Sequence, residues 1–187
     1  MTVIEDKFSA KFEEVAANIK HRGAYYQEDA SEKGMALIEA KYKDTKIYWL
    51  ADVKEDRIFS ARFFAYGGKV SLVVAETLCT MVEGLTVDEA CSLLKEDVDA
   101  KLRDNPDVSS VPESKQKAFE IVDEILKLVK DQYVSAKGVA IASASINKED
   151  FKSTTELNLV AQAWLGLTLE EQKEQIELVL DEHIRPA

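Results

Sequence analysis

The hydrophobic pattern near the start of the chain has the period of a helix. Apolar side chains within residues 3–20 recur at spacings of three and four positions, which places them on one stripe of a helix. We therefore predict an amphipathic helix that packs on a core. The polar stretch at residues 27–33 predicts a loop. The apolar stripe consists of Ile4, Phe8, Phe12, Val15, Ala16 and Ile19.

After Gly34 the pattern becomes typical of β-strands. Three runs rich in Ile, Val, Tyr, Phe and Trp, at residues 35–42, 46–53 and 58–66, are joined by connectors short enough for hairpins. They predict a three-stranded antiparallel meander. In the third run, apolar and polar positions alternate, so we expect helices to cover one face of the sheet. The apolar positions of that run are Phe59, Ala61, Phe63 and Ala65.

The helical period returns at residue 69. A helix over about residues 70–83 is predicted to end at Gly84, which can adopt the left-handed cap conformation. Thr86 and Glu89 have capping-box spacing, in which each side chain accepts a hydrogen bond from the other residue's backbone amide, so a new helix is predicted to begin there.

Ser110 and Glu113 repeat the capping-box spacing ahead of a long apolar stripe that reaches about Tyr133. Residues 1–134 therefore predict one α+β domain, in which helices pack on one face of a small sheet. The stripe consists of Ala118, Ile121, Ile125, Leu128 and Val129.

The C-terminal part has a different composition. Small residues dominate after Tyr133, which indicates a linker or a weak strand, and we favour a linker over residues 135–152. Residues 153–187 predict two further helices, which must pack on the main domain, on another chain or on sequence that is not present here, because short helices bury little surface alone. Their capping boxes are Ser153 with Glu156 and Thr168 with Glu171.

Charge and composition exclude several classes of protein. The formal charge of -11 repels phosphate backbones and anionic lipid surfaces, so neither nucleic acid nor a membrane is an expected partner. The two cysteines, Cys79 and Cys91, are too few for a disulfide framework and fit a cytoplasmic protein, in which we expect them to be small buried side chains. No catalytic constellation and no Gly-rich phosphate loop is present, so we do not expect an enzyme.

Two motifs at fixed spacing resemble a known family. The chain contains A-R-F-F-A-Y-G-G over residues 61–68, and G-L-T-V-D-E-A over residues 84–90 begins sixteen residues after Gly68. This resembles the signature of the NifU/IscU iron-sulfur cluster scaffolds: A-R-F-x-x-Y-G-C, a helix of the same length, then G-x-[ST]-x-D-E-A. The resemblance covers residues 1–134 and implies the IscU-like α+β fold, here followed by two C-terminal helices.

The resemblance also implies a ligand site, which this chain has altered. In the family, three cysteines and an aspartate, often with a histidine, surround a pocket where a [2Fe-2S] cluster is built. The corresponding positions here are Tyr42, Asp44, Gly68, Glu113 and Ser114. Only Asp44 keeps its ligand chemistry, so we expect a vestigial pocket without a bound cofactor, and Asp44 is at most a weak metal ligand. Iron or an iron-sulfur cluster is implied by the family alone.

These residues imply a role in iron-sulfur cluster assembly without the cysteine ligands. We expect a docking or accessory function, with cluster carriage elsewhere and with assembly proteins such as a cysteine desulfurase as partners. A homo-oligomer is a further expectation. The alternative is a ligand-free protein-interaction or regulatory module derived from the scaffold fold.

A second, shorter resemblance lies at the end of the chain. Residues 170–187 are similar to the opening helix of the Nfu domain, in which a C-x-x-C pair that carries a cluster follows a few dozen residues later. The sequence ends at Ala187 before any such pair. We therefore expect residues 153–187 to be the start of a truncated Nfu-like domain.

Overall fold

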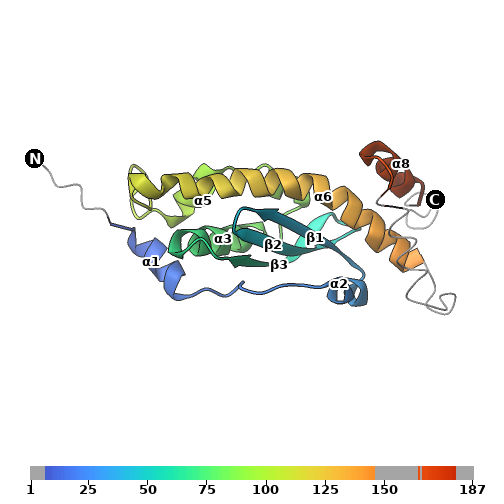
Figure 1. Cartoon of the computed structure of the whole chain (residues 1–187), viewed down its shortest axis with the longest axis horizontal. Helices are drawn as coiled ribbons and strands as arrows, with labels where there is room; N and C mark the ends of the chain where they lie inside the picture. Colours follow the sequence, from blue (N-terminus) through green and yellow to red (C-terminus); the bar gives the residue numbers. More distant parts are fainter. Residues whose placement is uncertain (1–6, 146–163, 165, 180–187) are drawn as a thin grey trace, which may run out of the picture.

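A computed structural model describes residues 7–145, 164 and 166–179. It has one antiparallel sheet in the order β1-β2-β3, with α3 and α6 packed against it (Figure 1). The α+β class predicted from the sequence is confirmed. The elements are α1 (Ala10–Ala17), α2 (Gln27–Lys33), β1 (Met35–Tyr42), β2 (Thr45–Asp52), β3 (Arg57–Ala65), α3 (Lys69–Val82), α4 (Val87–Cys91), α5 (Lys95–Leu102), the 3-10 helix η1 (Glu113–Phe119), α6 (Glu120–Ser145) and α8 (Leu169–Val179).

The sheet is the predicted meander, with strand boundaries within one residue of those expected. One position of the third strand differs. Phe59 is 59% exposed, although the alternation placed it on the apolar face. Leu50 pairs with Ser60 while the next residue, Ala51, pairs with Ile58, so Phe59 is an extra residue in a β-bulge. The bulge shifts the alternation by one position, and Ile58 is buried in its place.

The core lies between the sheet and the two long helices. Trp49 and Phe63 of the sheet, Val73 of α3 and Ile125 of α6 are fully buried in one hydrophobic cluster. Each such side chain contributes about 1.5 to 3 kcal/mol through the apolar surface that it removes from water. Phe12 of α1 joins the same cluster, which confirms that the first amphipathic helix packs on the core.

The junction between α3 and α4 forms as predicted. Gly84 has φ +85, so it ends α3 in a conformation that favours glycine. The Thr86 amide donates to Glu89 Oε2 at 2.8 Å, and the Glu89 amide donates to Thr86 Oγ1 at 3.2 Å, which is the predicted capping box.

The predicted capping box at Ser110 is wrong. The Ser110 hydroxyl is fully buried and donates to Asp99 Oδ1 at 2.5 Å, and the Ser110 amide donates to the same oxygen at 2.9 Å. Because Asp99 on α5 engages this serine, the next helix begins instead after Pro112, as the 3-10 helix η1. The regular helix α6 follows at Glu120, and its apolar stripe faces the core as expected.

Residues 27–33 form helix α2, where we predicted a loop. The Asp29 carboxylate accepts a hydrogen bond from the Tyr26 amide at 2.7 Å, and Gly34 ends the helix with φ +63. Only Ala30 of this helix is buried. A helix with a single buried side chain has almost no apolar stripe, so the hydrophobic pattern could not reveal it.

The segment predicted as a linker is helical over residues 135–145. Helix α6 continues to Ser145, and α8 lies beside its C-terminal part (Figure 1). The small residue Gly138 also lets Trp164 pack on α6, because a Cβ atom at this position would overlap the indole ring. The capping box of Thr168 with Glu171 is confirmed by a 2.7 Å hydrogen bond from the Thr168 amide to Glu171 Oε2.

Other predictions concern residues that lie outside the described part of the chain: Ile4, the capping box of Ser153 with Glu156, and residues 146–152 of the linker. The division of the chain at residues 134 and 152 stays a prediction. None of the helices in the described ranges is long and apolar enough to span a membrane.

Candidate functional site

The turn between β1 and β2 meets the junction between β3 and α3. Asp44 lies in this turn, and its carbonyl accepts a hydrogen bond from the Tyr66 amide at 3.1 Å. A Cβ atom at Gly67 would overlap both the Asp44 carboxylate and the Ser71 hydroxyl. The fold therefore brings Asp44 against Gly67, and a larger residue at this position would have to displace the side chains of Asp44 and Ser71.

Gly68 precedes α3 and has φ +89. No atom lies within 4 Å of the position that a Cβ atom would occupy, so a side chain has room there. The backbone conformation, however, is one that residues other than glycine rarely adopt. The structure thus has glycine geometry at the position where the family has a cysteine.

The structure shows no direct tie between the other predicted site residues and this junction within the part of the chain that it describes. Tyr42 is half-buried at the edge of the core, and the Lys43 ammonium lies 5.0 Å from the centre of its ring. Glu113 and Ser114 are exposed at the start of η1, which packs against α3. Among the described residues, no hydrogen bond or ion pair joins either side chain to Asp44.

Lys69 is a neighbour of the site that sequence reasoning did not identify. It follows Gly68 directly, and its ammonium group pairs with Glu13 of α1. The same ammonium lies 5.2 Å from the ring centre of Phe8 and 5.9 Å from that of Phe12, within the range of cation–π attraction. No motif connects these residues, because only the tertiary fold brings α1 beside the start of α3.

Both cysteines lie away from Asp44. Cys79 is fully buried in α3, eight residues beyond Ser71, which is about 12 Å along a helix. Burial raises the pKa of its thiol far above the ordinary value. Cys91 is half-buried in α4, where its Sγ lies 3.6 Å from the Leu126 carbonyl oxygen, and burial raises its pKa to about 11. Neither thiol favours the thiolate form that binds metals.

A buried carboxylate anchors the segment before α2. Glu76 of α3 is 3% exposed and accepts hydrogen bonds from the amides of Lys20, at 3.0 Å, and His21, at 2.9 Å. His21 Nδ1 lies 2.8 Å from Glu76 Oε1, and its Nε2 lies 3.5 Å from Glu83 Oε2. His21 is therefore held between Glu76, within α3, and Glu83, at the C-terminal end of α3. The next residue, Arg22, forms a β-bridge with Phe63 of β3.

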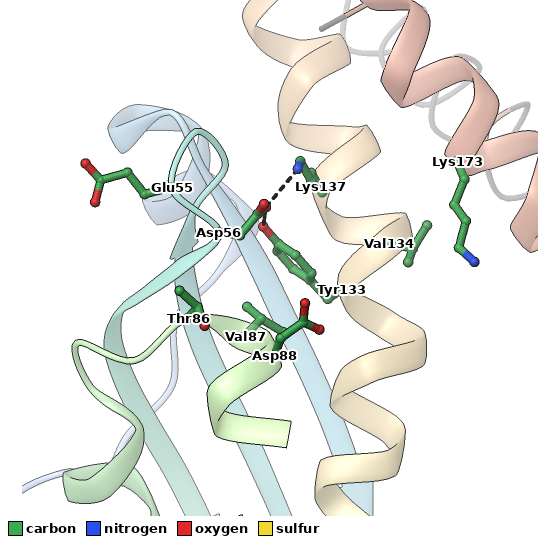
Figure 2. Close-up of a pocket in the computed structure, with 9 residues that line it drawn as sticks. All are labelled: Glu55, Asp56, Thr86, Val87, Asp88, Tyr133, Val134, Lys137 and Lys173. Atoms are coloured by element: carbon green, nitrogen blue, oxygen red, sulfur yellow. Dashed lines mark hydrogen bonds and ion pairs between the residues drawn. The ribbon is translucent and has the colours of Figure 1, made fainter. Parts of the chain in front are cut away.

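A surface pocket of about 340 Å³ lies between the β2–β3 turn, α4, α6 and α8 (Figure 2). The Tyr133 hydroxyl donates to Asp56, and Lys137 Nζ lies 2.8 Å from the same carboxylate. Burial, followed by the bond to Asp56, raises the pKa of Tyr133 well above its ordinary value. These groups satisfy one another, which indicates that they fasten the turn to α6 rather than await a ligand.

Comparison with known proteins now identifies the family. The family model described as "NifU-like N terminal domain" matches residues 8–140, which is well over half of the chain. The chain belongs to this family. Its members serve iron-sulfur cluster assembly, so the suspected resemblance over the first part of the chain is confirmed.

Comparisons with curated proteins and solved structures add no functional information on the NifU-like domain. No curated protein sequence matches the chain. One similar solved structure is titled "Crystal structure of a hypothetical protein at 2.3 A resolution"; it is 16% identical, with a TM-score of 0.33, over 72% of this chain and 92% of that chain. A similarity this low supports no conclusion about fold or function.

An iron-sulfur cluster does not fit the donor atoms that this NifU-like domain offers. Tyr42, Asp44, Glu113 and Ser114 present oxygen, and Gly68 presents no side chain. Iron in such clusters is held by thiolates, and both thiols lie elsewhere. Within the described residues, no group of three or more His, Cys, Asp and Glu side chains is placed to hold a metal ion.

Proposed function

We propose that this NifU-like domain acts in iron-sulfur cluster assembly as a docking protein and that another domain or protein carries the cluster. One observation carries the proposal. The chain belongs to the family and brings Asp44 against Gly67, and the motif spacing assigns oxygen or hydrogen, in place of sulfur, to each cysteine position of the family's pocket. A protein that keeps the shape of a scaffold without its ligands retains surfaces for other assembly proteins, among which we propose a cysteine desulfurase.

The chemistry of the pocket supports this role. A [2Fe-2S] cluster needs four ligands, and in most proteins all four are cysteine thiolates. Asp44 alone supplies one hard oxygen ligand, and its carboxylate lies against Gly67.

Anaerobic reconstitution with ferrous iron and sulfide tests the first half of the proposal. We expect the purified chain to show no visible absorption band of a [2Fe-2S] cluster and less than one iron per ten chains after desalting, on the order of adventitious binding. A chromophore with two irons and two sulfides per chain would refute the docking role as stated. The Cys79→Ser/Cys91→Ser double variant is the control, since any weak colour that persists in it comes from adventitious iron sulfide.

Binding to a purified cysteine desulfurase tests the second half. Isothermal titration calorimetry with the native chain should give a saturable complex in the absence of iron, because docking requires no cluster. If no heat and no complex are detected while a family scaffold that has its cysteines does bind the same enzyme, the desulfurase is not the partner.

A further inference from the structure

The face of the sheet that points away from the core carries its own ordered set of side chains. The strand register places Lys41, Lys46 and Phe64 in one row across the three strands, and Glu39, Tyr48 and Arg62 in the next. Their neighbours along each strand, such as Ile47 and Phe63, are fully buried in the core. Because side chains alternate along a strand, both rows project from the opposite face.

Aromatic side chains form a continuous surface on this face. The Tyr48 and Phe64 rings meet edge to face with centres 6.2 Å apart, and the Phe64 and Tyr66 rings stack with centres 6.4 Å apart. Tyr66 is 74% exposed. Tyr48 and Phe64 are half-buried beside it. Aromatic side chains grouped in this way are typical of protein-binding surfaces, where they act as anchors.

The charges around these rings have the opposite sign to the chain as a whole. Lys41, Lys46 and Arg62 against Glu39 give three cations and one carboxylate, a formal charge of +2, on a chain whose formal charge is -11. Lys46 Nζ lies 2.9 Å from Glu39 and 4.6 Å from the Tyr48 ring centre, so this cation is fixed beside the aromatic surface. Arg62 is exposed and stacks over the Tyr25 ring at 4.5 Å.

We propose that this cationic aromatic surface, formed by Lys41, Lys46, Tyr48, Arg62, Phe64 and Tyr66, docks a short acidic segment of a protein partner in cluster assembly. The inference rests on the proposed docking role and names the surface that performs it. Cations around the rim select carboxylates, and the rings provide apolar contact at the centre.

Charge also decides between occupants. A second copy of the chain, at -11, and a nucleic acid both carry strong negative charge over their whole extent and are repelled by the rest of this molecule. A short acidic segment on a partner of moderate charge can approach the cationic surface to within about 8 to 10 Å. At larger separations, salt largely screens the attraction.

The test uses two fluorescein-labelled peptides of equal length, one alternating Glu and Leu and the other alternating Lys and Leu, titrated with the full chain. Fluorescence anisotropy should show binding of the acidic probe alone, weakened at high salt. The triple variant Lys41→Glu/Lys46→Glu/Arg62→Glu should bind the acidic probe about tenfold more weakly. The matched control Lys101→Glu/Lys115→Glu/Lys130→Glu, which reverses three exposed lysines on the helices, should change the affinity less than about twofold.

A milder variant guards against misfolding. Tyr66→Ala removes one exposed ring without touching the core, and it should weaken binding about threefold or more. Equal losses in both triple variants, binding of the basic probe, or no binding of the acidic probe would each overturn the proposal. So would a native dimer in light scattering that the first triple variant dissociates, because a second copy would then cover this face. The binding measurement contains no iron. A failure to bind the acidic probe is therefore distinguishable from failure of the proposed function, which would show as formation of a cluster by the native chain.

Discussion

Removal of the Glu76 carboxylate should loosen the segment before α2 from the rest of the domain. Glu76 is almost fully buried and accepts hydrogen bonds from the amides of Lys20 and His21 and from the His21 ring. In Glu76→Ala, both backbone donors lose their acceptor in a partly buried setting, at about 1 to 2 kcal/mol each. We expect the free energy of unfolding to fall by about 3 kcal/mol, and the melting temperature by roughly 6 to 12 °C.

Urea denaturation followed by circular dichroism gives this free energy, and amide hydrogen exchange locates the effect. The amides of Lys20 and His21 should lose protection more than those of the strand that follows α2. Glu76→Gln keeps one oxygen acceptor and should cost about 1 kcal/mol. Glu32→Ala, at an exposed position of α2, is the matched control and should stay within about 0.5 kcal/mol of the native chain. A loss below 1 kcal/mol in Glu76→Ala, with unchanged exchange, would refute the assigned anchoring role.

Three other changes test separate parts of the structure. Burial raises the pKa of Asp99, but hydrogen bonds from Ser110 and Arg103 outweigh burial, so the pKa in the folded chain is lowered. The contribution of Asp99 to the free energy of unfolding is therefore present above the unfolded pKa of about 3.9 and is lost as the pH falls through the folded pKa. Asp99→Asn should therefore cost about 2 kcal/mol at neutral pH in urea titrations, and less as the pH falls through the folded pKa of Asp99; a cost that stays the same on acidification would contradict this. Gly68→Ala should cost about 1 to 2 kcal/mol through its φ of +89, whereas thermal melts that match the native chain would show that the backbone relaxes. Gly138→Ala should displace the Trp164 ring and shift its fluorescence to the red, and an unchanged spectrum would argue against the packing of Trp164 on α6.

Much of the fold could be predicted because long apolar patterns report on burial. The three strands and the stripe of α6 each bury a regular set of side chains, so their periods survive in the sequence. Helix α2 has only Ala30 buried and is held by its ends, which leaves no period to detect. The bulge at Phe59 depends on pairing with β2, and the role of Ser110 depends on Asp99, eleven residues earlier. Such tertiary partners are invisible to a pattern read along one segment.

The candidate site divides in the same way. The meander and the helix after it bring Asp44 against Gly67, beside Gly68, while the vestigial pocket inferred from motif spacing stays a prediction. The pairing of Lys69 with Glu13 and the rows across the outer face of the sheet could not be predicted, since both require the strand register and the position of α1.

The conformation of Gly68 has a consequence for any attempt to reverse the loss of ligands. A cysteine side chain introduced at position 68 would meet no steric obstacle. The backbone, however, would have to leave a region of positive φ that residues other than glycine rarely adopt. Exchanging side chains alone would therefore not build a cysteine ligand at this position; the peptide unit ahead of α3 must also turn.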